Sequence, residues 1–209
     1  MIAEFEKWPS ISRRSKEVMV ITEKINGTNA CVIFLPSHLW TGGALPLTTV
    51  TGALGDSYDV FAQSRTRFIY PDDDNFGFAW WVNSNAQALF DTLGVGKHFG
   101  EWWGSGLPCS YGLKEKRFSL FNARRWQNIL AYDTDQTSVE GLRIVPLLYV
   151  GPFVGKAMDD AVARVTEGSV AVPGFKSEGV VVYFREMDSS LKILVENDDI
   201  HKWEVAKNA

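Results

Sequence analysis

Glu23-Lys24-Ile25-Asn26-Gly27-Thr28-Asn29 is the stretch that decides the fold, because a polar turn with one lysine joins two apolar runs. Residues 18–22 precede the turn and residues 29–35 follow it, and both runs are predicted strands. A lysine attacks a phosphorus centre only when it is unprotonated, and desolvation, neighbouring cations or a bound metal favour that form. Lys24 is therefore a candidate nucleophile, with a surface lysine in a hairpin turn as the plain alternative.

The remaining chain alternates strand-like and helix-like patterns. Residues 76–93, and the segment after Gly151-Pro152, carry apolar side chains at the three- and four-residue steps of amphipathic helices. The segment 36–54 is rich in Gly, Thr and Pro and predicts a loop or a loose hairpin. Further strands are predicted at residues 60–64, 98–103, 118–126, 143–150, 179–184 and 191–195. The expected fold is α+β, with mostly antiparallel strands and two main helices, in a single domain over residues 1–209.

Composition limits the function classes. The chain has 209 residues, of which 45% are hydrophobic and 22% charged, as in globular proteins. Its net charge of -4 argues against non-specific coating of nucleic acid, but it permits a local basic groove. Two cysteines without a Cys-x-x-Cys spacing favour a reducing compartment over a disulfide framework or a zinc site. No apolar run approaches the ~20 residues of a membrane span, so we expect a soluble, cytoplasmic protein.

The lysine stretch resembles motif I of the covalent nucleotidyltransferases, which comprise DNA ligases, RNA ligases and mRNA capping enzymes. Its Glu-Lys-x-x-Gly-Thr-Asn form is most similar to RNA ligases of the phage T4 RNA ligase 2 and RNA-editing type, a type that a virus could encode. Five further segments resemble later motifs in the family order: Ser64-Arg65-Thr66, Phe99-Gly100-Glu101-Trp102-Trp103-Gly104, Phe118-Ser119-Leu120-Phe121-Asn122, Ser177-Glu178-Gly179-Val180-Val181 and Leu191-Lys192-Ile193-Leu194.

The resemblance implies a role for each matched residue. Lys24 would be the nucleophile, and Glu178 would bind Mg²⁺ or Mn²⁺, which prefer oxygen ligands. Glu101 would bind the ribose, Phe121 would stack on adenine, and Arg65 and Lys192 would neutralise phosphate charge. The other expected nucleotide-binding residues belong to motif I: Glu23, Ile25, Gly27, Thr28 and Asn29. Plain structural alternatives are a buried, paired Glu101, a core Phe121 and a surface Glu178.

The sequence departs from the family pattern at two positions. Asn122 stands where the family usually has Asp, and Leu194 stands where motif V usually has a second lysine. Lys202 is one candidate to supply that missing charge, and Lys192 alone is another. The resemblance also implies an ATP-grasp-like catalytic domain, and residues 196–209 leave no room for an OB domain. We therefore expect efficient self-adenylation and weak sealing, or sealing that depends on an accessory RNA-binding protein.

The implied function is ATP-dependent RNA ligation. A covalent lysyl-AMP would form, AMP would pass to an RNA 5′-phosphate, and a 3′-hydroxyl would then attack and release AMP. The substrates would be ATP and RNA ends, either nicked or single-stranded. Three alternatives stay open: a minimal ligase for DNA or RNA–DNA nicks, a degenerate domain that binds nucleotide or nucleic acid without catalysis, and an unrelated α+β domain with chance motifs.

Overall fold

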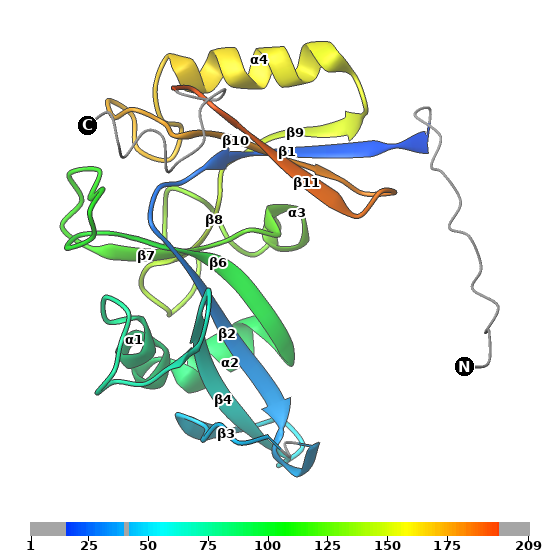
Figure 1. The fold of residues 1–209 in the computed structure, drawn as a ribbon. Helices are drawn as coiled ribbons and strands as arrows, with labels where there is room; N and C mark the ends of the chain where they lie inside the picture. The colour runs from blue at the N-terminus through cyan, green and yellow to red at the C-terminus, as the bar shows by residue number, and fades with distance from the viewer. Residues whose placement is uncertain (1–15, 40–41, 197–209) are drawn as a thin grey trace, which may run out of the picture.

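The computed structural model describes residues 16–39 and 42–196 and contains two β-sheets (Figure 1). Residues of both sheets line a cavity. The strands are β1 (Val18–Lys24), β2 (Thr28–Pro36), β3 (Thr48–Thr51), β4 (Ser57–Ser64), β5 (Phe68–Ile69), β6 (Gly96–Gly104), β7 (Lys116–Leu120), β8 (Leu142–Ile144), β9 (Leu147–Pro152), β10 (Gly179–Phe184) and β11 (Ser189–Leu194). The helices are η2 (Ser37–Leu39), α1 (Phe78–Ser84), α2 (Ala86–Leu93), α3 (Ala123–Trp126) and α4 (Gly155–Thr166).

The strands form one small and one large sheet. The small sheet has the order β11-β10-β1-β9, and the large sheet has the order β3-β4-β2-β6-β7-β8 with β5 beside β4. Every pairing is antiparallel except that of β7 with β8. The predicted α+β class with mostly antiparallel strands is therefore confirmed. β1 and β2 follow each other in sequence but lie in different sheets, so the lysine turn is where the chain crosses between them.

Alternation along the strands determines which side chains face the cavity. Ile21 of β1 and Val182 of β10 are cross-strand partners, and both pack against α4 on the outer side of the small sheet (Figure 1). Because neighbouring side chains point to opposite faces of a sheet, the intervening residues Thr22, Lys24 and Val181 face the cavity. The large sheet is built in the same way, with α1 and α2 on its outer face and a larger apolar core beneath them.

Two predicted strands are wrong in their extent. Residues 143–150 do not form one strand, because β8 ends at Ile144 in the large sheet and β9 begins at Leu147 in the small sheet. Pro146 lies between them, where it lacks the N–H that a continuous ladder requires, and its carbonyl accepts a hydrogen bond from the Glu23 amide. Residues 118–126 are also divided, since β7 ends at Leu120 and the one-turn helix α3 follows.

The predicted helices are only partly right. α4 confirms the second helix, whereas residues 76–93 form two helices that are separated at Asn85. The Asn85 side chain donates a hydrogen bond to the carbonyl of Trp81, which competes with a continuous helical ladder. Within 36–54, β3 pairs with β4 as a loose hairpin. None of the helices in the described segments is long and apolar enough to cross a membrane. Cys31 and Cys109 are both free thiols.

Candidate active site

The cavity between the sheets has a volume of about 770 Å³, within the range of small-molecule sites. Ten of the twelve predicted site residues line it, and they come from both sheets: Glu23, Lys24, Ile25, Gly27, Thr28, Asn29, Arg65, Glu101, Phe121 and Glu178. Lys192 does not line it, and Lys202 lies outside the described residues. The sequence motifs therefore converge on one space, although they span more than 150 positions of the chain.

Lys24 and Glu178 form an ion pair on the small-sheet side of the cavity. Lys24 ends β1, Glu178 precedes β10, and the register pairs Lys24 with Gly179. The Lys24 Nζ lies 2.6 Å from the Glu178 Oε2, and about a fifth of each side chain is exposed at 21% and 20%. A cation that replaced Lys24 at Glu178 would release the lysine amine into the cavity.

Gly179 fixes the position of Glu178. Its φ of 148° lies in a region that side-chain-bearing residues rarely adopt, and a Cβ there would lie 2.0 Å from the carbonyl oxygen of Ile193. The glycine thus lets β10 and β11 approach each other directly beside the acid. Glu178 is further held through its carbonyl, which accepts a hydrogen bond from the Val195 amide.

A chain of hydrogen bonds crosses the opposite wall, on the large sheet. The Arg65 Nε donates to the Asn29 Oδ1 at 2.9 Å, and the Asn29 Nδ2 donates to the Glu101 Oε2 at 3.0 Å. Asn29 and Glu101 are direct cross-strand partners on β2 and β6. These hydrogen bonds align the Glu101 carboxylate, the Asn29 amide and the Arg65 guanidinium in a single row. Such a row suits a ligand with hydroxyl and phosphate groups.

Glu101 is the most buried acid of this wall, with 7% of its surface exposed. Burial is the main cause that raises the pKa of Glu101, and the negative charge of Glu178 also raises it. The positive charge of Lys24 and the hydrogen bonds from Asn29 and Gly27 lower this pKa in part, and the net result is a pKa of about 7. Glu101 therefore titrates near neutral pH, where it can either accept or donate a hydrogen bond.

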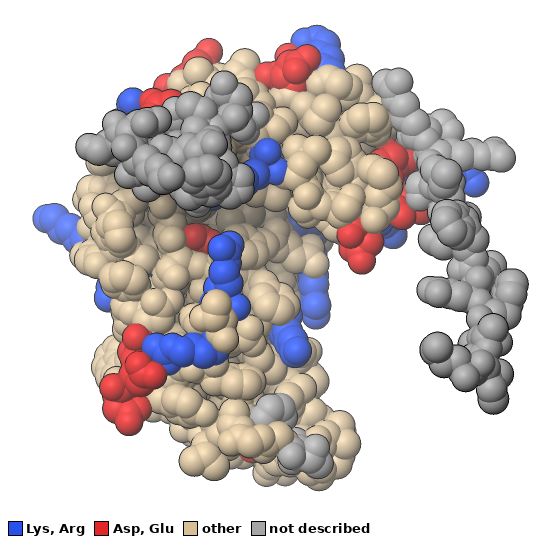
Figure 2. All heavy atoms as spheres, viewed as in Figure 1, with Lys and Arg blue, Asp and Glu red and all other residues tan. Residues whose placement is uncertain are grey.

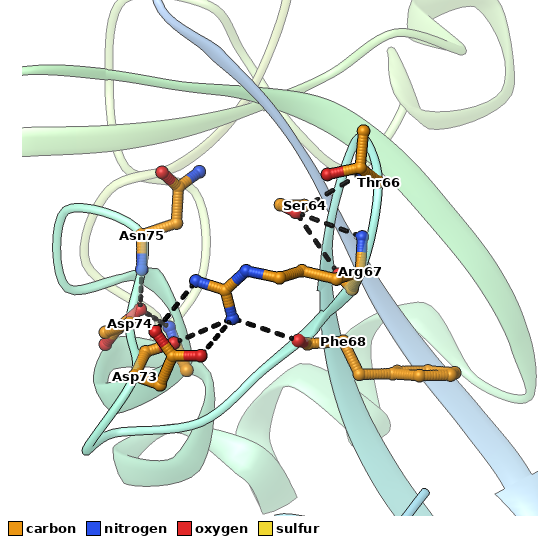
Figure 3. Close-up of polar contacts among 8 residues, drawn as sticks. Ser64, Thr66, Arg67, Phe68, Asp73, Asp74 and Asn75 are labelled. Atoms are coloured by element: carbon orange, nitrogen blue, oxygen red, sulfur yellow. Dashed lines mark hydrogen bonds and ion pairs between the residues drawn. The ribbon is translucent and has the colours of Figure 1, made fainter.

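Arg65 is presented by a rigid turn after β4, shown in Figure 3. The Arg67 guanidinium contacts both carboxylate oxygens of Asp73, at 2.7 and 3.0 Å, and its Nη1 also donates to the carbonyls of Phe68 and Asp73 (Figure 3). The Ser64 hydroxyl accepts from the amides of Thr66 and Arg67 (Figure 3). Since the turn is held on both sides, Arg65 is directed towards Asn29.

Phe121 supplies an apolar platform in the same cavity. It follows β7, it is 43% exposed, and Val181 lies among the lining residues contributed by the small sheet. An exposed ring opposite an aliphatic side chain is a suitable slot for a flat base. Asn122, where the family usually has Asp, accepts a hydrogen bond from the Arg125 amide and caps α3.

Three motif I residues have structural roles that the sequence did not indicate. The Glu23 Oε2 accepts hydrogen bonds from the amides of Val170 and Ala171, so this carboxylate is engaged away from the nucleophile. Ile25 is buried in the large core. Gly27 was expected to approach a ligand, but a Cβ there would lie 2.5 Å from the Trp102 carbonyl oxygen, so it is required by the approach to β6.

Lys192 and Leu194 lie on the cavity side of β11. The register pairs Lys192 with Val181 and Leu194 with Gly179, which in turn pairs with Lys24. Leu194 therefore occupies the same cross-strand row as Lys24, two strands away. An apolar side chain stands where a lysine would come closest to the nucleophile, and the exposed Lys192 is one row further along.

Two arginines that line the cavity were not among the predicted site residues. Arg124 lies on α3 and Arg185 follows β10, so they line the cavity from the large-sheet and small-sheet sides respectively. Figure 2 shows Lys and Arg side chains at the level of the hollow between the two parts of the molecule. The period-two spacing of 181, 183 and 185 could have revealed Arg185, whereas Arg124 depends on a helix that was predicted as a strand.

Residues 17–203 match the family model for RNA ligases. The chain belongs to the RNA ligase family. Among solved structures, this RNA ligase chain is similar to three mutants of the Naegleria gruberi RNA ligase. One, with ATP and Mn, is 15% identical with a TM-score of 0.56, and the match covers 90% of this chain. A second, with AMP and Mn, is 16% identical with a TM-score of 0.57 and the same coverage.

A third mutant, solved without ligand, is 16% identical, with a TM-score of 0.56 and 94% of this chain covered. Each match covers 53% of the Naegleria protein, so this RNA ligase chain spans about half the length of the structures it resembles. At this identity the likeness establishes the fold. Comparison with curated proteins gives no match.

Proposed function

We propose that this chain is the adenylating domain of an ATP-dependent RNA ligase of the RNA ligase 2 type, with Lys24 as the nucleophile. The observation that carries the proposal is the placement of Lys24, with its Nζ 2.6 Å from the Glu178 carboxylate, inside a cavity that also contains Arg65, Glu101 and Phe121. A nucleophile, an acid able to bind a metal, and separate contacts for base and sugar meet there, as covalent nucleotidyl transfer requires.

The chain's own residues divide the work of binding. Phe121 and Val181 would hold the adenine, and Glu101 would accept hydrogen bonds from the ribose. Arg65, held by Asn29 at 2.9 Å, would orient the α-phosphate. Lys24 would then form a bond to the α-phosphorus as pyrophosphate leaves, which yields a lysyl-AMP. Lys192, on the same face of the small sheet, would contact phosphate oxygens from the outer rim.

Glu178 is the residue that would hold a divalent cation. The described residues contain no cluster of three or more His, Cys, Asp or Glu side chains that could bind a metal by itself. Mg²⁺ and Mn²⁺ do not require such a cluster, since Mg²⁺ is commonly held by one or two carboxylates together with substrate phosphates. The donor set therefore fits Mg²⁺ or Mn²⁺ that enters with ATP, and such an ion would shield phosphate charge.

Transfer to RNA would follow in the same cavity. The 5′-phosphate of an RNA end would attack the lysyl-AMP, which frees Lys24 and leaves AMP on the RNA. A 3′-hydroxyl would then attack that phosphate and release AMP. Arg124 and Arg185 form no ion pair with an acid in the described ranges 16–39 and 42–196. They would widen the positive surface beyond the nucleotide, which suits a polyanionic partner. An accessory RNA-binding protein would strengthen this step.

The proposal is tested by covalent labelling. The protein is incubated with α-labelled ATP and Mg²⁺ or Mn²⁺ and then separated under denaturing conditions. We expect label on the wild-type protein and none on Lys24→Ala, whereas Lys176→Ala, which removes an exposed lysine outside the cavity, labels normally. Wild-type protein that carries no label with either metal would rule the proposal out.

A further inference from the structure

Beside the cavity, the large sheet presents a second exposed aromatic ring that the nucleotide site does not use. Phe99 on β6 is 51% exposed and does not line the cavity. It lies two residues before Glu101, so both side chains point to the cavity side of the sheet. Gly100, between them, faces the core, where a Cβ would lie 2.7 Å from the Phe118 ring. Phe99 is not the only exposed ring on this side of the sheet, since Phe121 is 43% exposed.

Phe99 is a direct neighbour of the proposed adenine platform. The Phe121 amide donates a hydrogen bond to the Phe99 carbonyl at 3.0 Å, which extends the β6–β7 ladder by one pair beyond Gly100 and Leu120. Directly opposed residues of antiparallel strands have Cβ atoms about 5 Å apart. The two phenylalanines thus occupy opposed backbone positions, and Phe121 lines the cavity while Phe99 lies outside its lining.

Two cations lie on the same face of the large sheet as Phe99, with Lys97 on the same strand and Arg65 after β4, two strands away. Lys97 is exposed on the same face of β6, two residues before Phe99, and its charge reaches Cys31, the cross-strand partner of Phe99. Arg65 lies one row nearer the nucleophile, where it bonds Asn29. Neither Lys97 nor Arg65 forms an ion pair with any acid in the described segments. This face of the sheet therefore combines a flat apolar surface with uncompensated positive charge.

We propose that Phe99 is a stacking platform for an unpaired nucleobase of the RNA end, with Lys97 contacting a phosphate beside that base while Arg65 stays on the phosphate of the adenylate. A ring flanked by cations is the usual composition of single-strand binding surfaces, because every base has a stacking face and every linkage carries a negative charge. A protein partner would not require unpaired cations beside the ring. The inference rests on the proposed function, since it assigns Phe99 to the RNA nucleotide that follows the bound adenylate.

The test separates RNA binding from adenylation. We measure the fluorescence anisotropy of a short, labelled, 5′-phosphorylated single-stranded RNA, and in parallel the covalent labelling with α-labelled ATP. Phe99→Ala is expected to weaken RNA binding by about 10-fold or more, from the loss of one stacking contact, while labelling stays at the wild-type level. Phe99→Trp restores binding, which a merely structural role of Phe99 would not explain.

Trp80→Ala is the matched control. Trp80 is 64% exposed on α1, on the outer face of the large sheet, so its removal is expected to leave RNA binding unchanged. Unaltered RNA binding by Phe99→Ala overturns the inference, and so does an equal loss in Trp80→Ala. A parallel loss of labelling in Phe99→Ala also overturns it, because the ring would then support the cavity. Failure of the wild type to label refutes the proposed function instead.

Discussion

Glu178 and Glu101 lie on opposite walls of the cavity, and they differ in exposure and in the group that each contacts. Glu178, on the small sheet, is one-fifth exposed and paired with Lys24 at 2.6 Å. Glu101, on the large sheet, is 7% exposed, hydrogen-bonded to the neutral Asn29, and has its pKa raised to about 7. The small-sheet wall thus offers a carboxylate that can exchange Lys24 for another cation, and the large-sheet wall offers an oriented hydrogen-bonding group.

Under the proposed function, this contrast assigns the reaction to the small sheet and recognition of the nucleotide to the large sheet. Lys24 and Glu178 come from adjacent strands of the small sheet, whereas Arg65, Asn29, Glu101 and Phe121 come from the large sheet or directly follow one of its strands. Substitutions in the first wall should lower the rate of chemistry, and substitutions in the second should weaken substrate binding or change its pH dependence.

The largest effect is expected from Glu178→Gln. The substitution removes the proposed metal ligand and the partner of Lys24, so the single-turnover rate of self-adenylation should fall about 100-fold or more, as for other lost electrostatic contacts to a transition state. Glu196→Gln, which removes an exposed acid paired with Lys176 outside the cavity, should match the wild type. A Glu178→Gln rate within a few-fold of wild type would contradict the assignment of reaction to this wall.

The next effect concerns Glu101 and is visible in stability. Its folded pKa of about 7 lies above the ordinary value of 4.5, so the folded state holds a proton that the unfolded chain releases. The contribution of Glu101 to stability is therefore complete below about pH 4.5 and is lost as pH rises through about 7. The loss should reach at most about 3 kcal/mol.

Denaturant unfolding of wild type and Glu101→Gln between pH 4 and 8, in the absence of nucleotide and metal, checks this expectation. Gln keeps an oxygen that can accept from Asn29 but does not titrate, so the difference between the two unfolding free energies should change across that interval. Two curves that run parallel over the whole range would show that burial does not perturb Glu101. Glu115→Gln, at a half-exposed acid paired with Arg117, should not produce the same change.

Phe121→Ala is expected to affect binding and leave the chemistry intact. Loss of one stacking contact should raise the ATP concentration for half-maximal labelling about 10-fold, with little change in the maximal rate. Phe121→Trp keeps a larger ring and should behave like the wild type. A fall in maximal rate without a change in half-saturation would place Phe121 with the reaction and would break the separation between the walls.

The smallest expected effect is tighter binding of ATP. Leu194→Lys would place a cation in the cross-strand row of Lys24 and should lower the half-saturating ATP concentration by about 2- to 5-fold, the scale of a solvent-accessible charge pair. Leu191→Lys is the control, because Leu191 pairs with Val182 on the α4 side of β11. Equal effects from both substitutions would show that overall charge, and not position, is responsible.

Sequence patterns predicted the elements that have a clear local signal. β1, β2 and β10 were found as short β-branched or apolar runs, and α4 was found from its helical apolar spacing. The division of residues 143–150 between two sheets was missed because apolar residues lie on both sides of Pro146, and only this proline marks the change of sheet. α3 was missed because a one-turn helix is too short to show a period.

The site divides in the same way. Motif spacing predicted that Lys24, Arg65, Glu101, Phe121 and Glu178 would share one site, and the cavity contains all of them. The true partners of Glu23 could not be predicted, since Val170 lies 147 positions away in the chain. Likewise, the reason for Gly27 is the backbone of β6, which only the folded chain brings near.

The chain crosses between the two sheets twice, at residues 25–27 and at residues 145–146, and these crossings have a mechanical consequence. A motion that widens the cavity would move the large sheet relative to the small one about these two short connections. The pairing of Lys24 with Gly179 and the contact of Lys24 with Glu178 both lie on the small-sheet side, so we expect such a motion to leave them unchanged. Under the proposed function, the cavity could then open and close between reaction steps without realigning Lys24.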